Sequence, residues 1–299
     1  MSDAASSNVI DLSRLPPPTV VELLAFDTIR ARNVDMLQTL APWFDATIAS
    51  DPAVKLLELF SYREILLRQD FNDRGRQLMV AYATGANLDQ LGAIMGVTRL
   101  TIDPGDADQG IAPVFESDDD FRRRIVLAPE SFSVAGPADA YVFWALSAAP
   151  TIADAIASTP APGDVTVAIL SRNGQGTASA DEIAEVEAVL THRSIRPLTD
   201  RVTVVSAEIV PFVVDAELRI YVGPDSDVVR AAAEAALAAY LARQRRLGRD
   251  VARSGILAAL HVEGVQSVNL ISPAADVAIG DTQVGWCAGT DVTVIGNGF

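Results

Sequence analysis

The sequence has very little of the side-chain chemistry on which catalytic and metal-binding sites depend. Its 299 residues include one cysteine, Cys287, two histidines, His192 and His261, and one lysine, Lys55. A single cysteine cannot form an internal disulfide, and neither histidine has a cysteine at zinc-ligand spacing. A single lysine excludes Walker-type phosphate binding and Schiff-base chemistry everywhere except at Lys55. The sequence therefore predicts no cofactor and no metal ion.

Positive charge is also scarce. The chain carries 23 Lys and Arg residues against 39 Asp and Glu residues, which gives a formal net charge of −16 and a pI near 4.4. Nucleic acids and anionic membranes attract proteins mainly through basic side chains, so we expect the protein to bind neither. No apolar run reaches the ~20 residues of a membrane-spanning helix, and residues 1–18 lack the basic and apolar regions of a signal peptide. We expect a protein made and folded in the cytosol.

Two loops look at first like ligand sites, and each has a simpler interpretation. Residues 172–177 (RNGQGT) are glycine-rich but lack the third glycine of a dinucleotide fingerprint and the Gly-Lys-Ser/Thr of a phosphate loop. They are typical of a turn between a strand and a helix. Asp103, Asp106 and Asp108 do not match the calcium-binding register of an EF-hand at its glycine and glutamate positions. We interpret them as a solvated acidic loop.

The remaining candidates for catalysis are equally weak. Three acids at 118–120 are followed by three arginines at 122–124. Adjacent acids on a helix point ~100° apart and cannot converge on one bond, so this pattern predicts a helix start rather than a hydrolytic pair. His192, His261 and Cys287 have no nucleophile motif nearby. The sequence predicts no catalytic residues, and the protein is not expected to be an enzyme.

The N-terminal third is rich in helix signals. Residues 1–18 end in three prolines and predict an extended segment that lies across a partner. Residues 19–22 (TVVE) match a capping box and predict a helix over 20–32. Asp51-Pro52 predicts the start of a second helix, which continues to about residue 82. Residues 19–110 therefore form a predicted helical domain, with residues 101–116 read as a linker.

The second of these helices has more apolar positions than one buried face requires. A helix that is apolar on two sides must be covered on two sides, which indicates a partner. The candidate partner-interface residues are Val54, Leu57, Phe60, Ile65, Leu67 and Phe71.

The remaining two thirds alternate strand and helix signals. Strands at 165–170 and 202–205 flank a helix that begins at a capping box, Ser179 to Glu182, and predict a first domain over 111–207. A long strand at 212–222, an alanine-rich helix, a strand at 265–271 and short strands near 276–279 and 291–295 predict a second domain over 208–299. The predicted fold class is α+β: an all-helical N-terminal arm followed by two small domains of β-α-β type.

Six landmarks in the sequence occur in a familiar order. They are TGANLDQLGAIMGVTR (84–99), ESDDDFRRRI (116–125), VAGPADAYVFWAL (134–146), PGDVTVAIL (162–170), RPLTDRVTV (196–204) and LGRDVARSGILAAL followed by GVQSVNL (247–270). In this order the chain resembles the baseplate J-like family, the wedge proteins of contractile phage tails and related injection particles.

The resemblance implies a structural role in the virion tail baseplate. It implies a ring of sixfold symmetry around a central hub and spike, built from further copies of the chain together with a second wedge protein and sheath-initiating components. N-terminal helices of family members join a bundle with these neighbours, and the family has no catalytic residues to carry over.

One alternative of a different class is a soluble module that binds a carbohydrate or another ligand through the α+β domains. Such a module needs an exposed aromatic platform. Only Trp286 lies in a predicted loop, whereas Trp43 and Trp144 fall in predicted helical regions.

Overall fold

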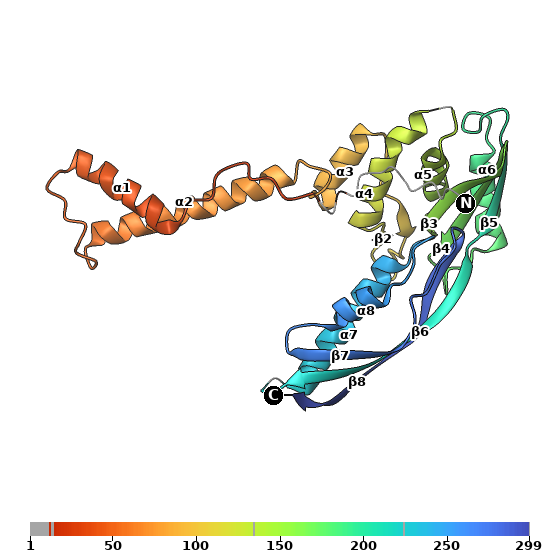
Figure 1. Ribbon diagram of the computed structural model, residues 1–299. Coiled ribbons are helices and arrows are strands. Elements are labelled where there is room, and N and C mark those ends of the chain that lie inside the picture. The colour runs from red at the N-terminus through yellow and green to blue at the C-terminus, as the bar shows by residue number, and fades with distance from the viewer. Residues whose placement is uncertain (1–11, 13–14, 134, 224, 299) are drawn as a thin grey trace. The chain divides into compact units, whose positions relative to one another are not determined.

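The computed structural model describes residue 12 and residues 15–133, 135–223 and 225–298, so that most of the predicted extended segment 1–18 lies outside the described residues. The chain divides into two compact units. Residues 10–99 and 117–125 form a helical unit, and residues 100–116 and 126–299 form an α+β unit (Figure 1). The predicted α+β fold class with an all-helical N-terminal arm is confirmed. The boundaries predicted at residues 18, 110 and 207 stay predictions.

The helical unit is built around a hairpin of two helices, which we call the arm. Helix α1 (Phe26–Leu40) lies beside the first half of α2 (Pro52–Arg76) in Figure 1. As predicted, α2 begins at Asp51, whose carboxylate accepts a 2.7 Å hydrogen bond from the Ala53 N–H, with Pro52 in the first turn. The helix ends at Arg76, earlier than the predicted residue 82.

The helix predicted over 20–32 begins later than its capping signal. The N–H groups of Val20 and Val21 donate to Asn72 Oδ1 at 2.7 and 2.8 Å, and Asn72 Nδ2 donates to the Val21 carbonyl at 2.8 Å. These contacts hold the backbone between Thr19 and Glu22 against α2, and the segment is not helical. Gly75 permits the approach, because a Cβ there would lie 2.6 Å from Val20 Cγ2. Helix α1 instead starts at Phe26, without a side-chain cap.

Two further helices complete the helical unit. Helix α3 (Gly85–Ile94) ends near Gly96, whose positive φ of 72° is the predicted stop signal. Helix α4 (Asp118–Leu127) begins after Ser117, whose hydroxyl accepts from the Asp120 N–H as predicted. The fully buried ring of Phe121 packs on α3 at Gly92, where a Cβ would lie 2.5 Å from the ring.

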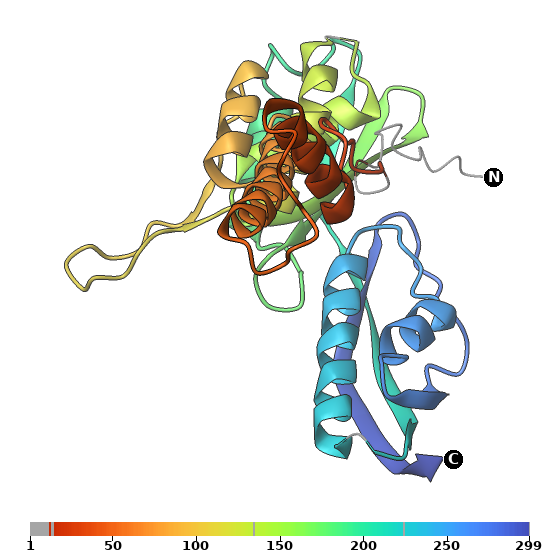
Figure 2. The same ribbon diagram turned by 90° about the vertical axis from the view of Figure 1, so that its left-hand side faces the viewer.

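The segment predicted to be a linker contains a short antiparallel ribbon. Strand β1 (Thr101–Asp103) pairs with β2 (Val114–Phe115), drawn in gold in Figure 2. Asp103 is the last residue of β1, and Asp106 and Asp108 lie in the loop between the strands. Asp103 and Asp106 accept hydrogen bonds from backbone N–H groups within two or three residues, so they shape the loop itself.

The first half of the α+β unit is a three-stranded sheet with order β3-β4-β5. A 3-10 turn (Ala128–Phe132) and helix α5 (Ala138–Ala148) precede β3 (Ile152–Ala161), which pairs antiparallel with β4 (Asp164–Ser171). Helix α6 (Ala180–Leu190) then leads to β5 (Arg201–Ser206), parallel to β4. This confirms the predicted β-α-β unit, and Ser179 and Glu182 form the predicted capping box. Strand β3 was not predicted, because its alanines carry little strand preference.

The second half is another three-stranded sheet, with order β7-β6-β8. Strand β6 (Glu208–Tyr221) pairs antiparallel with β7 (Val265–Ser272) and parallel with β8 (Gln283–Gly298). Helices α7 (Ser226–Gln244) and α8 (Arg253–Leu260) cover one face of this sheet (Figure 2). Alternate β6 residues from Val214 to Ile220 are buried beneath them. The strand predicted at 276–279 is a single bridge at Val277.

Candidate functional site

Helix α2 has one face that packs within its own unit. Val54, Ser61 and Asn72 are buried on this face. Ser61 accepts a hydrogen bond from Asn33 of α1 at 3.1 Å and donates to the Leu57 carbonyl. The steps of seven and eleven residues between the three buried positions keep them on one side of the helix. This face is therefore occupied by α1 and by the segment that precedes it.

The opposite side of α2, which we call the outer face, is apolar and uncovered. Its large apolar side chains are each between 43% and 60% exposed: Leu56, Leu59, Phe60, Leu66, Leu67 and Phe71. They are related by steps of three, four and seven residues, so they form a stripe along the helix. Contiguous apolar surface of this kind marks an interaction site in a soluble protein.

The structure divides the six predicted interface residues between the two sides of α2. Phe60, Leu67 and Phe71 lie on the outer face. Leu57 and Ile65 are half-buried, and Val54 is fully buried in the hairpin. The sequence analysis missed Leu56, Leu59 and Leu66. Leu56 lies four residues before Phe60, and Leu59 lies seven residues before Leu66, and such helical spacings are a signal that could have found them.

A second exposed apolar group lies around the connection between α1 and α2. Trp43 is 86% exposed, and Met36, Leu40 and Ile48 are also exposed. Trp43 lies in a turn rather than in the predicted helix. Exposed tryptophan is costly in a free subunit and is enriched where proteins bind one another.

The charge of the chain is distributed unevenly over its length. Residues 10–99 contain 11 acidic and nine basic residues, whereas residues 100–299 contain 27 acidic and 14 basic residues. Near the outer face the charges are paired along α2, as between Arg74 and Asp70 at 2.7 Å. On the packing side, a hydrogen bond from Arg68 lowers the pKa of Glu64. The outer face of α2 therefore lies in the part of the chain with the smaller net charge.

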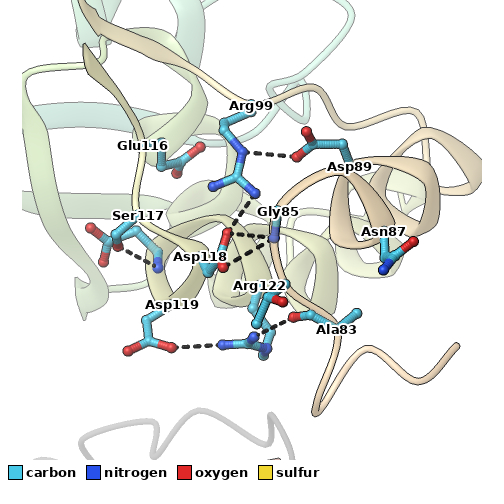
Figure 3. Close-up of polar contacts among 12 residues, drawn as sticks. Ala83, Gly85, Asn87, Asp89, Arg99, Glu116, Ser117, Asp118, Asp119 and Arg122 are labelled. Carbon is cyan, nitrogen blue, oxygen red and sulfur yellow. Dashed lines mark hydrogen bonds and ion pairs between the residues drawn. The ribbon is translucent and has the colours of Figure 1, made fainter. Parts of the chain in front are cut away.

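Helices α3 and α4 are joined by the residues of the acid–arginine motif, shown in Figure 3. Arg99 donates to Asp89 of α3 at 2.8 Å and to Asp118 of α4 at 2.7 Å, and Asp118 also accepts from the Gly85 N–H. Burial raises the pKa of Asp118, but hydrogen bonds from Arg99 and Gly85 more than offset this, so the pKa lies below its usual value. The network fixes α3 against the start of α4.

The neighbouring motif residues have different partners. Arg122 donates to the carbonyls of Val80 and Ala83, both at 2.7 Å, and to the Asp119 carboxylate at 2.6 Å (Figure 3). Asp118 and Asp119 thus point to separate partners. They do not form a pair of carboxylates that could act on one substrate bond.

Within the described part of the chain, no group of three or more His, Cys, Asp or Glu residues is placed to hold a metal ion. None of the helices described is long and apolar enough to cross a membrane. What the geometry offers instead is the exposed apolar outer face of α2. A chain of this build belongs to the class of structural subunits of larger assemblies.

Comparison with known proteins identifies the assembly. Residues 49–106, 133–206 and 213–295 match the baseplate J-like N-terminal, central and C-terminal domains, respectively. Baseplate protein J of Escherichia phage P2 is 45% identical over 300 residues, which cover 97% of this chain and 98% of that protein. The chain belongs to the baseplate J-like family. It is a structural component of the tail baseplate of a contractile injection system, as predicted.

One solved structure is also similar. It is a chain in the sixfold-symmetrised cryo-EM structure of the anti-feeding prophage (AFP) baseplate, with 19% sequence identity and a TM-score of 0.39. The match covers 60% of this chain and 43% of that chain.

Proposed function

We propose that the chain is a wedge subunit whose arm binds the helices of other baseplate proteins through the outer face of α2. This proposal rests on the stripe of six exposed apolar side chains on α2, whose other side packs within the helical unit. A long, straight stripe fits another helix better than it fits a compact ligand. Candidate partners are a second wedge protein, the hub and spike, and sheath-initiating components.

The exposed area is large enough to matter energetically. Complete burial of a Leu or Phe side chain stabilises by ~1.5–3 kcal/mol, so covering the exposed half of six such side chains contributes roughly 5–9 kcal/mol. Association itself costs about 4–15 kcal/mol in lost freedom of motion. The outer face alone is therefore marginal, and we propose that Trp43 and its apolar neighbours join the same interface.

We further propose that copies of the chain form a closed ring through their α+β units. Such a ring requires head-to-tail contacts between two different surfaces of the chain. The proposal gives the chain no catalytic role, which agrees with the separate partners of its clustered acids.

Co-purification of the chain with its neighbouring baseplate proteins tests the arm interface. Leu67→Asp and Phe71→Asp place a charge on the outer face without disturbing the hairpin, so we expect each to reduce recovery of the partner at least tenfold. Leu198→Asp is the matched control, because Leu198 is fully exposed in the α+β unit. Normal partner recovery with both arm variants would refute the interface, and imaging of particles that places the chain in the tube or sheath would refute the wedge assignment.

The ligand-binding alternative needed an open aromatic platform at Trp286. Trp286 lies within β8 rather than in a loop, and the Arg245 guanidinium is stacked 4.6 Å from the centre of its ring. Arg245 therefore covers one face of the Trp286 ring, on which a ligand would have to stack. This observation favours the structural role.

A further inference from the structure

The two sheets of the α+β unit follow one another without a linker. Strand β5 ends at Ser206 and β6 begins at Glu208, and the intervening Ala207 is buried. The Ala207 N–H donates to the Ile169 carbonyl of the first sheet at 2.8 Å, and the next N–H, of Glu208, donates to Thr282 beside the second sheet at 3.1 Å. Successive residues therefore bind to different sheets, which leaves no free residue to act as a hinge.

An apolar cluster joins the two halves. Ala168 and Leu170 of β4 pack with Leu247 and Val284 from the second half, around Ala207. Side chains from both halves share this cluster, so separating the halves exposes apolar surface to water.

The segment that follows α7, residues 245–248, binds the first half of the unit directly. We call it the latch segment. The Leu247 N–H donates to Asp154 Oδ2 at 2.9 Å, and Arg246 donates to the Ala153 carbonyl at 2.9 Å. Asp154 lies in β3 and is only 2% exposed. A buried carboxylate that accepts from the other half makes separation costly, because its hydrogen bonds would have to be replaced.

Arg245 completes the contact at the glycine-rich loop. Its Nη2 donates to the Gly174 carbonyl at 3.1 Å while its guanidinium stacks on Trp286. Gly176 makes room for this contact, because a Cβ there would lie 2.4 Å from Leu170 Cδ1 and 3.3 Å from Arg245 Nη2. The glycine-rich loop 172–177, whose sequence suggested a nucleotide site, therefore binds Arg245 of the same chain.

We propose that the central and C-terminal family domains move as one rigid body, held together by the latch segment. When subunits of an assembly rearrange, a rotation of one of these domains then rotates the other by the same angle. The proposal does not depend on which partners bind the arm, and a failed arm interface leaves it intact.

Distance measurement by electron–electron double resonance tests the proposal in the full chain. Spin labels at Glu187→Cys on α6 and Ala238→Cys on α7, both exposed, report on the two halves in a Cys287→Ser background. We expect one narrow distance distribution. The triple variant Arg245→Gln, Arg246→Gln and Leu247→Ala is expected to broaden it at least twofold.

The control variant Arg243→Gln with Arg249→Gln removes the same number of charges from exposed positions beside the latch segment, and it should leave the distribution narrow. A broad or divided distribution in the protein with an intact latch segment overturns the proposal, whatever the variants do. So does a narrow distribution in the triple variant, provided that circular dichroism shows it folded. If the triple variant does not fold, Arg245→Gln alone carries the same test.

Discussion

Replacing Asn72 by alanine is expected to free the segment before α1 from α2. Asn72 is the only side chain that binds the backbone of both Val20 and Val21 among the described residues, and it is 2% exposed. The substitution leaves two N–H groups and one carbonyl without their partner. The same change removes buried volume between the segment and α2.

The expected loss of stability follows from the three hydrogen bonds. Each contributes ~0.5–1.5 kcal/mol net, so Asn72→Ala should lower the free energy of unfolding of the helical unit by roughly 2–4 kcal/mol. Asn72→Asp keeps the acceptor for both N–H groups but places an oxygen against the Val21 carbonyl. We expect its loss to be smaller than that of the alanine variant.

Urea denaturation followed by far-UV circular dichroism measures these losses. Hydrogen exchange at Val20 and Val21 gives a local measurement, because their amides should exchange faster in Asn72→Ala. A loss below ~0.5 kcal/mol with unchanged exchange would refute the reasoning. The capping-box interpretation makes the opposite prediction, a loss of ~1 kcal/mol in Thr19→Ala, where we expect almost none.

Two further predictions concern helix starts and use urea denaturation as well. Ser179→Ala removes the side chain that accepts from the Glu182 N–H and should cost about 1 kcal/mol, whereas Ser179→Asp retains a cap and should cost much less; equal losses would contradict the capping box. Asp118→Asn weakens the bond from Arg99 and should cost about 1 kcal/mol at neutral pH. Because the pKa of Asp118 is lower in the folded protein than in the unfolded chain, its contribution is present above the unfolded pKa and is lost as the pH falls through the folded pKa. The variant and the unmodified protein should therefore converge in stability at acidic pH, and a constant difference would contradict this assignment.

Prediction from the sequence succeeded where the signal and its partner are close in the chain. Asp51 caps α2 through Ala53, and Ser179 caps α6 through Glu182, two and three residues away. It failed at residues 19–22, where the competing partner Asn72 is about fifty residues distant and invisible to a local pattern. It also failed at β3, whose strand character comes from pairing with β4 rather than from its alanine-rich composition.

The candidate interface shows the same division. An excess of apolar positions in α2 was evident from the sequence alone, and it predicts that a partner covers this helix. Which residues face that partner depends on where α1 and the preceding segment pack. Val54 is buried in the hairpin of α1 and α2. Leu56 and Leu66 are as apolar as Val54, but they remain exposed.

By itself, the sequence determined the family to which this protein belongs and how few of its side chains are of catalytic or metal-binding types. The chain has one lysine, one cysteine and two histidines, which are residue types common in catalytic sites. The order of the six landmarks can be read directly from the sequence, without knowledge of the fold. Three features became visible only in the tertiary structure. They are which side chains of α2 are exposed, the hydrogen bonds of Asn72 to the segment before α1, and the contacts of the latch segment with the first half of the α+β unit. Each of these depends on contacts between residues far apart in the chain, and hydrogen bonding and burial at that range arise only when the chain is folded.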